Sequence, residues 1–327
     1  MRIAVDAMGG DHAPREIVRG ALDYAASSAD EVILVGDVPR LEREIAEYTD
    51  ARPSTIRLVD APEVVEMGEH PATALRAKRR ASIVVATDLV RNGEADAVVS
   101  AGSTGATMAA AIFRLGRIEG IDRPALPAHM LTPTGPVMLL DVGANVDSSS
   151  DNLVQFAAMG AIFAEHVLKV PNPRIGLLNI GEEVEKGDTL AREAHEKLAT
   201  AGLRFVGNVE AHEMLGHRAD VVVCDGFVGN VVLKFYESVA RLIVRLMKRD
   251  APQLLEREDI RKVFRTLDYS QYGGAPLLGV KGVSIMCHGS SSANAVKNAV
   301  GLAVQSVRSN LSQHIGTEMA QHEATRA

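Results

Sequence analysis

The sequence contains no tryptophan and few aromatic residues of any kind. Aromatic side chains make up 4% of the 327 residues, so alanine, valine, leucine, isoleucine and methionine must fill the core. Such a core is typical of parallel sheets covered by helices rather than of antiparallel sandwiches. The apolar fraction of 46% and the charged fraction of 24% are those of a globular protein, and they exclude disorder and fibrous structure.

Features that indicate secretion, membrane insertion or nucleic-acid binding are also absent. The two cysteines, Cys224 and Cys287, form no disulfide framework or zinc pattern, and a reducing, cytoplasmic location fits them best. No apolar run reaches the roughly 18 residues of a membrane span, and the N-terminus lacks a signal-peptide stretch. The net charge of -7 argues against general nucleic-acid binding, which depends on basic residues that neutralise phosphates.

Short β-branched runs alternate with longer helix-period segments along the chain. The strand-like runs occupy 2–7, 31–36, 55–60, 96–102, 136–143, 174–181, 203–209, 220–226 and 282–289. The helical segments lie near 14–28, 37–48, 72–91, 105–116, 150–169, 188–201, 227–249 and 292–309. This alternation predicts parallel βαβ units in an α/β fold. Because no proline- or serine-rich linker interrupts it, we expect residues 1–327 to form a single compact unit with a frayed tail at 310–327.

Six strand-like runs end in polar, glycine-rich turns. These turns read DAMGGDH, SAGSTGA, DVGANVDSSS, NIGEEVEKGD, CDGFVGN and CHGSSS. In open α/β sheets, ligands bind beyond the carboxyl ends of the strands. The turns therefore predict one composite site at that edge.

The first turn, DAMGGDHAP, carries more chemistry than a plain strand-to-helix connection requires. An ordinary turn with an aspartate cap leaves Asp6 and His12 unexplained. We expect the Gly9 and Gly10 amides to approach an anionic ligand, while Asp11 and His12 fix the shape of the turn. A metal site built from the two aspartates and the histidine matches no strong ligand spacing, so we expect no metal.

Several other turns open helices with free amides and hydroxyl groups, which suit an anion. Each of them also fits an ordinary capped helix. The phosphate- or substrate-binding residues predicted from these turns are Gly102, Ser103, Thr104, Gly105, Asn179, His288, Ser290 and Ser291.

Two further turns contain polar residues in unusual surroundings. Lys186 lies among three glutamates, where a salt-bridged lysine in a solvated acidic loop is the simplest interpretation. A lysine beyond a strand end also suits an anionic nucleophile or a developing oxyanion. Asp225 and Asn230 lie in an apolar run and need hydrogen-bond partners there. Cys224, in the same run, fits packing better than nucleophilic catalysis.

A helical surface element with basic and apolar residues is predicted at about 231–280. Its first part, 231–249, places apolar residues on one helical face and the basic residues Lys234, Arg241, Arg245 and Lys248 on another. A solvated basic face is the commonest explanation for this pattern. In an acidic protein such a face also suits an acidic carrier protein or anionic lipid head groups. The run RAKRR at 76–80 is a second basic cluster.

As an ordered set, the motifs resemble one protein family. DAMGGDHAP, SAGSTGA, DVGANVD, NIGEE…KG, CDGFVGNV.LK, YGGAPLLGVKG and HGSS…A…NA are similar to signatures of the bacterial phosphate acyltransferases of phospholipid synthesis. The similarity runs from residue 1 to about 309. Ser103 departs from the pattern, since the family more often has asparagine there.

The resemblance implies transfer of a long-chain fatty acyl group from acyl-[acyl-carrier protein] to inorganic phosphate, which gives acyl phosphate for phospholipid synthesis. It implies the three-layer αβα fold of phosphotransacetylases and of isocitrate and isopropylmalate dehydrogenases, and a homodimer. The acyl carrier protein and a downstream membrane acyltransferase are the implied protein partners, and we expect no cofactor. Lys186, Asp225 and Asn230 are carried over from the resemblance as active-site residues.

This chemistry suits the predicted residues. Phosphate is largely dianionic near neutral pH and is itself a nucleophile, and a thiolate leaves without obligatory protonation. The enzyme must therefore mainly position the reactants and stabilise charge. Lys186 and Asn230 are predicted to hold phosphate and the oxyanion, with Asp225 orienting one of them. The segment YGGAPLLGVKG at 272–282 is the predicted wall of an acyl groove.

Three alternatives remain open from the sequence. A short-chain phosphotransacetylase would use acyl-CoA, and a metal- and NAD-dependent decarboxylating dehydrogenase would need metal-binding aspartates that we do not find. A non-catalytic protein that binds acyl carrier or lipid is the third.

Overall fold

The computed structural model describes residues 1–132, 135–260 and 273–326. The chain divides into two compact units, each with its own sheet: unit 1 comprises Met1–Pro124 and Tyr272–Glu318, and unit 2 comprises Ala125–Gln271 and Met319–Ala327. This division differs from the single unit expected from the sequence. That expectation rested on the lack of a proline- or serine-rich linker. The chain passes from one unit to the other without such a linker, so its composition does not mark the boundary.

The sheet of unit 1 has six strands in the order β10-β11-β4-β1-β2-β3. The strands are β1 Arg2–Asp6, β2 Glu31–Gly36, β3 Ile56–Asp60, β4 Ala97–Ser100, β10 Ala275–Pro276 and β11 Val283–Met286. All neighbouring strands are parallel except β10 and β11. Since the parallel strands run in one direction, their carboxyl ends share one edge of the sheet.

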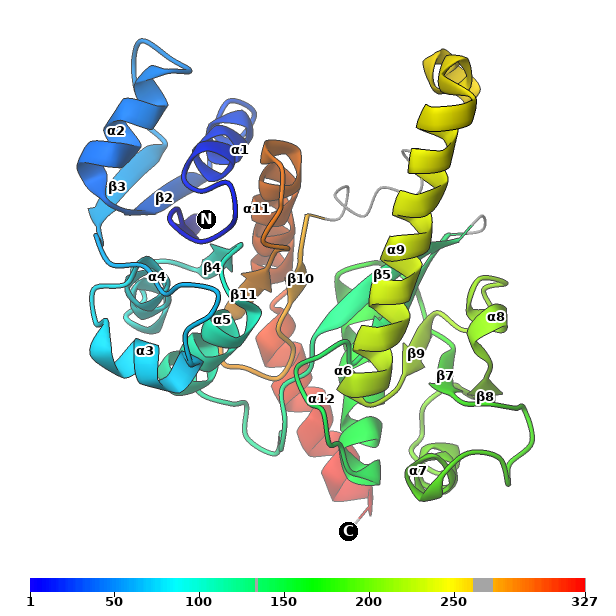
Figure 1. Ribbon diagram of the computed structural model, residues 1–327. Coiled ribbons are helices and arrows are strands. Elements are labelled where there is room, and N and C mark those ends of the chain that lie inside the picture. The colour runs from blue at the N-terminus through cyan, green and yellow to red at the C-terminus, as the bar shows by residue number, and fades with distance from the viewer. Residues whose placement is uncertain (133–134, 261–272, 327) are drawn as a thin grey trace. The chain divides into compact units, whose positions relative to one another are not determined.

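Helices cover both faces of this sheet (Figure 1). Ile3 and Val5 of β1 point to one face and Ala4 to the other, because strand side chains alternate. The first face packs against α1 Arg15–Ala25, α2 Val38–Ala46 and α11 Ala293–Arg308. The second packs against α3 Pro71–Ala77, α4 Ser82–Arg91 and α5 Thr104–Ala110, which continues into η1 Ala111–Leu115. Unit 1 is therefore a three-layer αβα sandwich.

The sheet of unit 2 has five strands in the order β5-β6-β9-β7-β8. The strands are β5 Pro127–Thr132, β6 Gly135–Leu140, β7 Ile175–Leu178, β8 Phe205–Val209 and β9 Val221–Val223. Among the described strands of this unit, β5 alone is antiparallel to its neighbour.

Unit 2 is layered in the same way. Val137 and Leu139 of β6 share a core with α8 Ala211–Met214 and with α9 Gly226–Asp250. On the opposite face, α6 Ser150–His166 approaches so closely that a side chain at Gly160 would meet Leu140 and Val221. α7 Thr189–Ala199 packs beside α6, and a short 3-10 helix, η2 Pro252–Glu256, follows α9.

The predicted α/β fold is confirmed, and all nine strand-like runs contain a strand. The two strands that the sequence did not predict, β5 and β10, are both antiparallel and both lie at a sheet edge. Each contains a proline, Pro127 or Pro276, and proline is tolerated at edges because it cannot donate a ladder hydrogen bond. The single helix predicted near 72–91 is two helices, α3 and α4.

The C-terminal segment is helical rather than frayed. α12 spans Leu311–Arg326, and the prediction of a frayed tail at 310–327 is wrong for these residues. Leu311 and Ile315, one helical turn apart, are 4% and 1% exposed, and the Ser312 hydroxyl donates to the Gly282 carbonyl at 2.9 Å. Burial of this apolar face holds a helix whose polar composition resembles that of a tail. In the described part of the chain, no helix has both the length and the hydrophobicity that crossing a bilayer requires.

The packing of α12 generates a stability prediction. Ile315→Ala should lower the free energy of unfolding by about 2–4 kcal/mol, because it removes a buried side chain and leaves a cavity. Gln313→Ala, at an exposed position of the same helix, should change it by less than about 0.5 kcal/mol. Urea unfolding of both variants measures the difference. Equal stability of the two variants would contradict the docked helix.

Candidate functional site

The six glycine-rich turns fall into two sets of three. Those after β1, β4 and β11 follow adjacent parallel strands of unit 1, and those after β6, β7 and β9 follow adjacent parallel strands of unit 2. The prediction that the turns gather at the carboxyl ends of strands is thus confirmed within each unit. The single composite site remains a prediction.

In unit 1, the turns after β1 and β4 touch through their glycines. A Cβ atom at Gly9 would lie 2.9 Å from the Gly102 Cα and would clash with the Asp6 carboxylate. Gly10 adopts a φ of +120°, which strongly favours glycine. The two consecutive glycines are therefore required for the backbone of one turn to lie against the other.

A buried carboxylate lies beneath this glycine contact. Asp6 is 2% exposed, and its Oδ2 accepts a hydrogen bond of 2.7 Å from the Ser100 hydroxyl. The Ser100 oxygen in turn accepts from the Gly102 amide at 3.0 Å and from the Thr107 hydroxyl at 3.3 Å. Burial raises the pKa of Asp6, although neighbouring hydroxyls and amides oppose that shift. The network fixes the turn after β4 against the end of β1.

The first turn is also tied to the turn after β11. The Asp11 amide donates to the Gly289 carbonyl at 2.8 Å, and the Asp11 carboxylate lies beside Gly289. The side chains of Asp11 and His12 are exposed. The backbone of Asp11 therefore fixes the shape of the turn, while α1 has no side-chain cap at its N-terminus.

The remaining predicted residues of unit 1 lie on these same turns. Ser103 caps α5 and accepts a hydrogen bond of 3.5 Å from the Ala106 amide. Thr104 is exposed at the first position of that helix, and Gly105 follows it. The His288 Nδ1 and the Ser290 hydroxyl lie 2.8 Å apart. The neighbouring Ser291 is buried, so it is the least accessible to a ligand.

In unit 2, a second buried aspartate organises the turns, and sequence reasoning missed it. Asp141 follows β6 and is fully buried. Its Oδ1 accepts from the amides of Leu126 at 2.9 Å and Ala144 at 3.2 Å, and its Oδ2 accepts from the Asn145 amide at 2.7 Å and side chain at 3.0 Å. Burial raises the pKa of Asp141, and these hydrogen bonds oppose it. The sequence feature that could have identified Asp141 is its position directly after the fully apolar run VMLL.

The start of α9 packs against this aspartate. A side chain at Gly226 or Gly229 would collide with Asp141 or its neighbours, so glycine is required at both positions. Asp225 caps the helix: its Oδ1 accepts from the amides of the two residues after Gly226, at 3.0 and 3.1 Å. Asn230 is exposed, and its Nδ2 lies beside Gly143 of the turn after β6.

Asp225 was predicted to orient Lys186 or Asn230. Within the described ranges its carboxylate makes no hydrogen bond to either side chain, and its function there is to cap α9. Asn230 instead belongs to the contact between α9 and the turn after β6.

The loop that carries Lys186 is held by two asparagines. The Asn179 side chain donates to the Lys186 carbonyl at 3.1 Å, and the Asn208 side chain donates to the Glu183 carbonyl at 2.8 Å. The loop glutamate Glu182 pairs with Arg218 at 2.9 Å. The Lys186 side chain is exposed, and among the described residues no carboxylate lies within 4.0 Å of its ammonium group. The simple interpretation of a salt-bridged lysine therefore does not hold in this part of the structure.

Both cysteines are unsuited to nucleophilic catalysis. Cys224 is buried and donates to the Asp141 carbonyl at 3.5 Å, and burial raises the pKa of its thiol well above the usual range. Burial also raises the pKa of Cys287 to about 12. The packing interpretation of Cys224 fits this environment.

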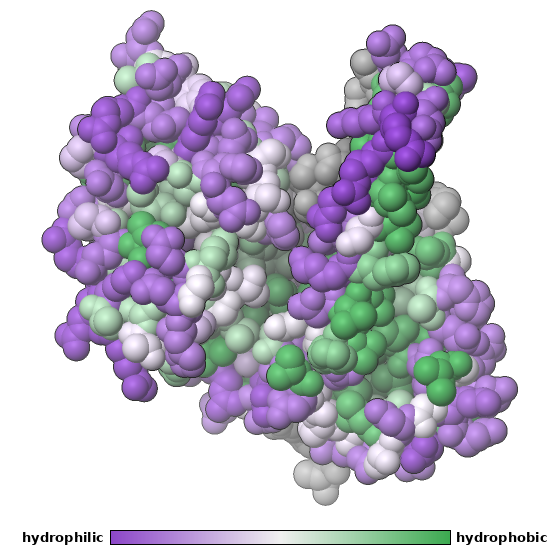
Figure 2. All heavy atoms as spheres, viewed as in Figure 1, coloured by the Kyte–Doolittle hydropathy of each residue, from purple (hydrophilic) through white to green (hydrophobic). Residues whose placement is uncertain are grey.

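α9 presents an apolar stripe to solvent. Its exposed members are Phe227, Val228, Val231, Phe235, Val239, Leu242, Ile243 and Leu246. Phe235 is 71% exposed, and the C-terminal part of the helix extends beyond the sheet of its own unit (Figure 1). Figure 2 shows this stripe in green along the helix, with hydrophilic side chains beside it.

The predicted basic residues of α9 form a basic edge, which comprises Lys234, Arg241, Arg245 and Lys248. Lys234 and Arg241 both approach the buried Glu237, at 3.5 and 3.7 Å. In the described ranges, Arg245 and Lys248 have no ion pair.

The predicted acyl-groove wall lies on unit 1. Residues 261–272, including Tyr272, lie outside the described residues. Leu277, Leu278 and Val280 are 3%, 1% and 1% exposed. These buried side chains present no apolar surface, so the described part of the segment does not form an open groove wall.

Comparison with known proteins gives the family. The model of the family described as "Fatty acid synthesis protein" matches residues 1–314. The chain belongs to this family. A relative from Heliobacterium modesticaldum, named phosphate acyltransferase, is 52% identical over 95% of both chains. A phosphate acyltransferase from Desulfitobacterium hafniense strain Y51 is 50% identical over 99% of both chains.

Solved structures share the fold at low sequence identity. A phosphotransacetylase from Streptococcus pyogenes matches with a TM-score of 0.66 and 17% identity over 94% of both chains. A 4-hydroxythreonine-4-phosphate dehydrogenase from Klebsiella pneumoniae matches with a TM-score of 0.56 and 16% identity over 93% of this chain and 99% of its own. The phosphotransacetylase-like fold that the sequence resemblance implied is confirmed.

The raised pKa of Asp6 predicts a pH-dependent effect on stability. Folded protein holds the Asp6 proton more tightly than unfolded protein does, so ionisation of this group disfavours folding as the pH rises above about 4. Asp6→Asn lacks that ionisation. The melting temperature of the variant minus that of the wild type should therefore increase as the pH rises above about 4, until Asp6 is ionised in the folded protein too. Asp11→Asn, at an exposed position of the same turn, is the control, and an Asp6→Asn difference that falls with pH would contradict the assignment.

Proposed function

We propose that this chain is a cytoplasmic phosphate acyltransferase that reversibly transfers a long-chain fatty acyl group from acyl-[acyl-carrier protein] to inorganic phosphate. The observation that carries the proposal is identity of about 50%, over 95–99% of the chain, to proteins named phosphate acyltransferase. The chain belongs to the family described as "Fatty acid synthesis protein", and this supports a fatty acyl group as the group that is transferred. The product, an acyl phosphate, would be consumed by a membrane acyltransferase in phospholipid synthesis.

The reaction needs no nucleophile from the protein. A phosphate oxygen attacks the thioester carbonyl carbon, a C–O bond forms, and the tetrahedral intermediate collapses with cleavage of the C–S bond. The thiolate departs and takes a proton from water. Burial of both cysteine thiols and their raised pKa values support direct attack by phosphate over an acyl-cysteine intermediate.

We assign Lys186 to charge stabilisation. Its ammonium group has no carboxylate partner in the described part of the chain, and two asparagines hold the loop that presents it. An exposed cation on an ordered loop suits the phosphate dianion or the oxyanion of the tetrahedral intermediate. Asn230 supplies a neutral hydrogen-bond donor at the start of α9. Asp225 acts by capping that helix and so by positioning Asn230.

We assign anion binding in unit 1 to the turns after β1, β4 and β11. The close contact of Gly9 with Gly102 leaves no side chain to cover the backbone there, and amides of glycine turns bind phosphate groups. His12, Thr104, His288 and Ser290 are exposed on the same turns and supply further donors.

The proposal extends to a homodimer that binds a membrane surface. Eight exposed apolar side chains on one helix form a patch of the kind that marks protein or membrane contacts. Their spacing of three and four residues along α9 fits helix–helix packing between two copies. The unpaired Arg245 and Lys248 border the stripe and suit anionic lipid head groups.

The preference of the protein for one acyl donor over another tests the proposed function directly. Purified protein with inorganic phosphate and long-chain acyl-[acyl-carrier protein] should release acyl phosphate, detected as its hydroxamate. Short-chain acyl-CoA should react at least about a hundredfold more slowly. Preference for short-chain acyl-CoA would instead favour a phosphotransacetylase, and no product from any donor would favour a non-catalytic binding protein.

Lys186→Ala should lower kcat by about 10²–10³, the loss typical of removing one group that stabilises an oxyanion. The fold should persist because the side chain is exposed and makes no ion pair in the described part. Glu185→Ala, on the same loop, is the matched control and should retain activity. Turnover by Lys186→Ala within threefold of the wild type would reject the assigned function of this lysine.

The α9 surface gives a separate prediction. Phe235→Asp combined with Leu242→Asp should convert dimers to monomers in analytical ultracentrifugation, because charges would replace the centre of the apolar stripe. Leu242→Met should remain dimeric.

With phosphatidylglycerol vesicles, the wild type should co-sediment and Arg245→Glu combined with Lys248→Glu should not. A wild-type monomer, or vesicle binding unchanged by the charge reversal, would contradict the respective part of the proposal.

A further inference from the structure

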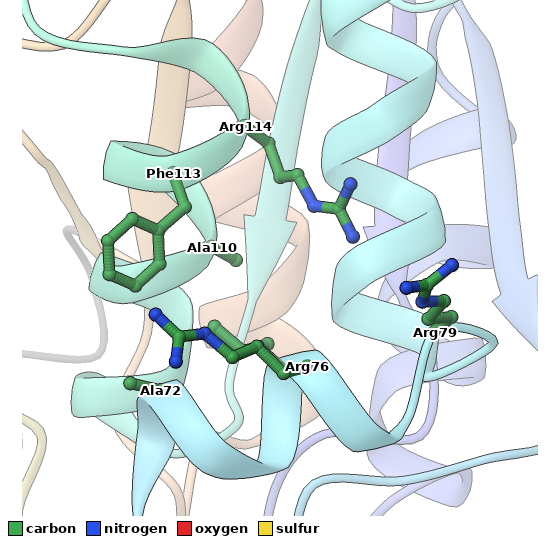
Figure 3. A pocket seen from close by; sticks show the side chains of 7 residues that line it. Ala72, Arg76, Arg79, Ala110, Phe113 and Arg114 are labelled. Carbon is green, nitrogen blue, oxygen red and sulfur yellow. The ribbon is translucent and has the colours of Figure 1, made fainter.

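Unit 1 contains a pocket that none of the predicted site residues lines. Its cavity volume is about 470 Å³. It lies between α3 and the end of α5 with η1 (Figure 3). The lining residues are Ala72, Leu75, Arg76, Arg79, Ala110, Phe113 and Arg114.

Two basic residues of the RAKRR cluster at 76–80 form ion pairs, and the other two line the pocket and give it positive charge. Lys78 pairs with Glu69 at 2.5 Å, and Arg80 pairs with Asp60 at 2.5 Å. In the described ranges Arg76 and Arg79 have no carboxylate within 4.0 Å, and both line the pocket.

The third arginine is only partly neutralised. Arg114 lies 3.6 Å from Asp88, a carboxylate that also pairs with Arg91 at 3.2 Å. A protein with a net charge of -7 therefore carries three guanidinium groups around one small cavity. Such a local excess of positive charge attracts an acidic partner.

The rest of the pocket is apolar. Leu75 and Ala110 are 6% and 1% exposed, whereas Phe113 is 63% exposed. An exposed phenylalanine beside arginines is the residue combination enriched where proteins bind one another. The exposed ring of Phe113 therefore supplies the apolar contact that a partner side chain would make.

The arginines do not converge as a site for a single phosphate would require. In Figure 3 the guanidinium group of Arg76 lies near Phe113, whereas that of Arg79 lies at the opposite side of the view. One phosphate is best held by donors directed at the same oxygens. Separated guanidinium groups fit several carboxylates spread over a protein surface.

We propose that this pocket docks the acidic surface of the acyl carrier protein. Carboxylates of the carrier pair with Arg76, Arg79 and Arg114, and an apolar side chain packs against Phe113. The proposal rests on the proposed function, which supplies this partner. It also moves carrier docking away from the basic edge of α9, where Glu237 already partly neutralises Lys234 and Arg241.

Direct binding of holo-acyl carrier protein, followed by fluorescence anisotropy, tests the docking without any need for catalysis. Arg76→Glu combined with Arg79→Glu should weaken binding at least about tenfold, because two attractions become repulsions. Phe113→Ser should weaken it several-fold. The matched controls are Arg43→Glu, at an exposed arginine of α2 without an ion pair in the described ranges, and Arg241→Glu combined with Arg245→Glu. Both controls should bind as the wild type does.

Kinetics separates this proposal from the proposed function. The Arg76 and Arg79 double variant should raise KM for acyl-[acyl-carrier protein] at least about tenfold, with kcat and the KM for phosphate unchanged. If the wild type turns over this substrate and the double variant matches it, only the docking site is overturned. Loss of carrier binding in the α9 double variant alone would place docking on the basic edge instead. A wild type that neither binds the carrier nor uses its acyl group would overturn the proposed function and the docking site together.

Discussion

Each unit depends on one buried aspartate at the carboxyl edge of its sheet. Asp6 ends β1 beneath the contact of two glycine turns, and Asp141 follows β6 and accepts four hydrogen bonds. Burial of a carboxylate is costly unless hydrogen bonds compensate for it. For Asp141 the compensating donors are mainly amides and a side chain of its own turn, and for Asp6 the donor is the Ser100 hydroxyl at the end of β4, which also accepts from the Gly102 amide of the next turn. The shape of the turns and the burial of the two carboxylates therefore depend on the same groups. The glycines are required because any side chain would displace these contacts.

These ordered turns leave the chemically useful groups exposed on a rigid base. Asn179 and Asn208 hold the loop of Lys186 through its carbonyl groups, and the ammonium group itself remains available. The reaction that we propose requires few other groups from the protein. Phosphate supplies the nucleophile and the thiolate is a good leaving group, so the protein must bind and orient anions. The proposed binding surfaces, the glycine turns and the arginine pocket, are directed at anionic partners.

Sequence patterns predicted the strands well, because alternating and β-branched runs encode burial directly. They missed β5 and β10, in which proline at an edge strand resembles a turn. They also misjudged 311–326, where burial of a few apolar side chains outweighs a polar composition. At the site, residue types drew attention to Lys186, Asp225 and Asn230, and the family resemblance made them active-site candidates. Hydrogen-bond partners depend on the fold, so the helix cap made by Asp225 and the network around Asp141 were visible only in three dimensions.

The central claim is that inorganic phosphate attacks the thioester directly. Incubation of the protein with acyl-[acyl-carrier protein] carrying a radiolabelled acyl group, first without and then with phosphate, tests this most directly. The account predicts no label on the protein in the absence of phosphate, followed by labelled acyl phosphate once phosphate is added. Label covalently attached to a side chain before phosphate is added, and transferred to phosphate afterwards, would contradict it.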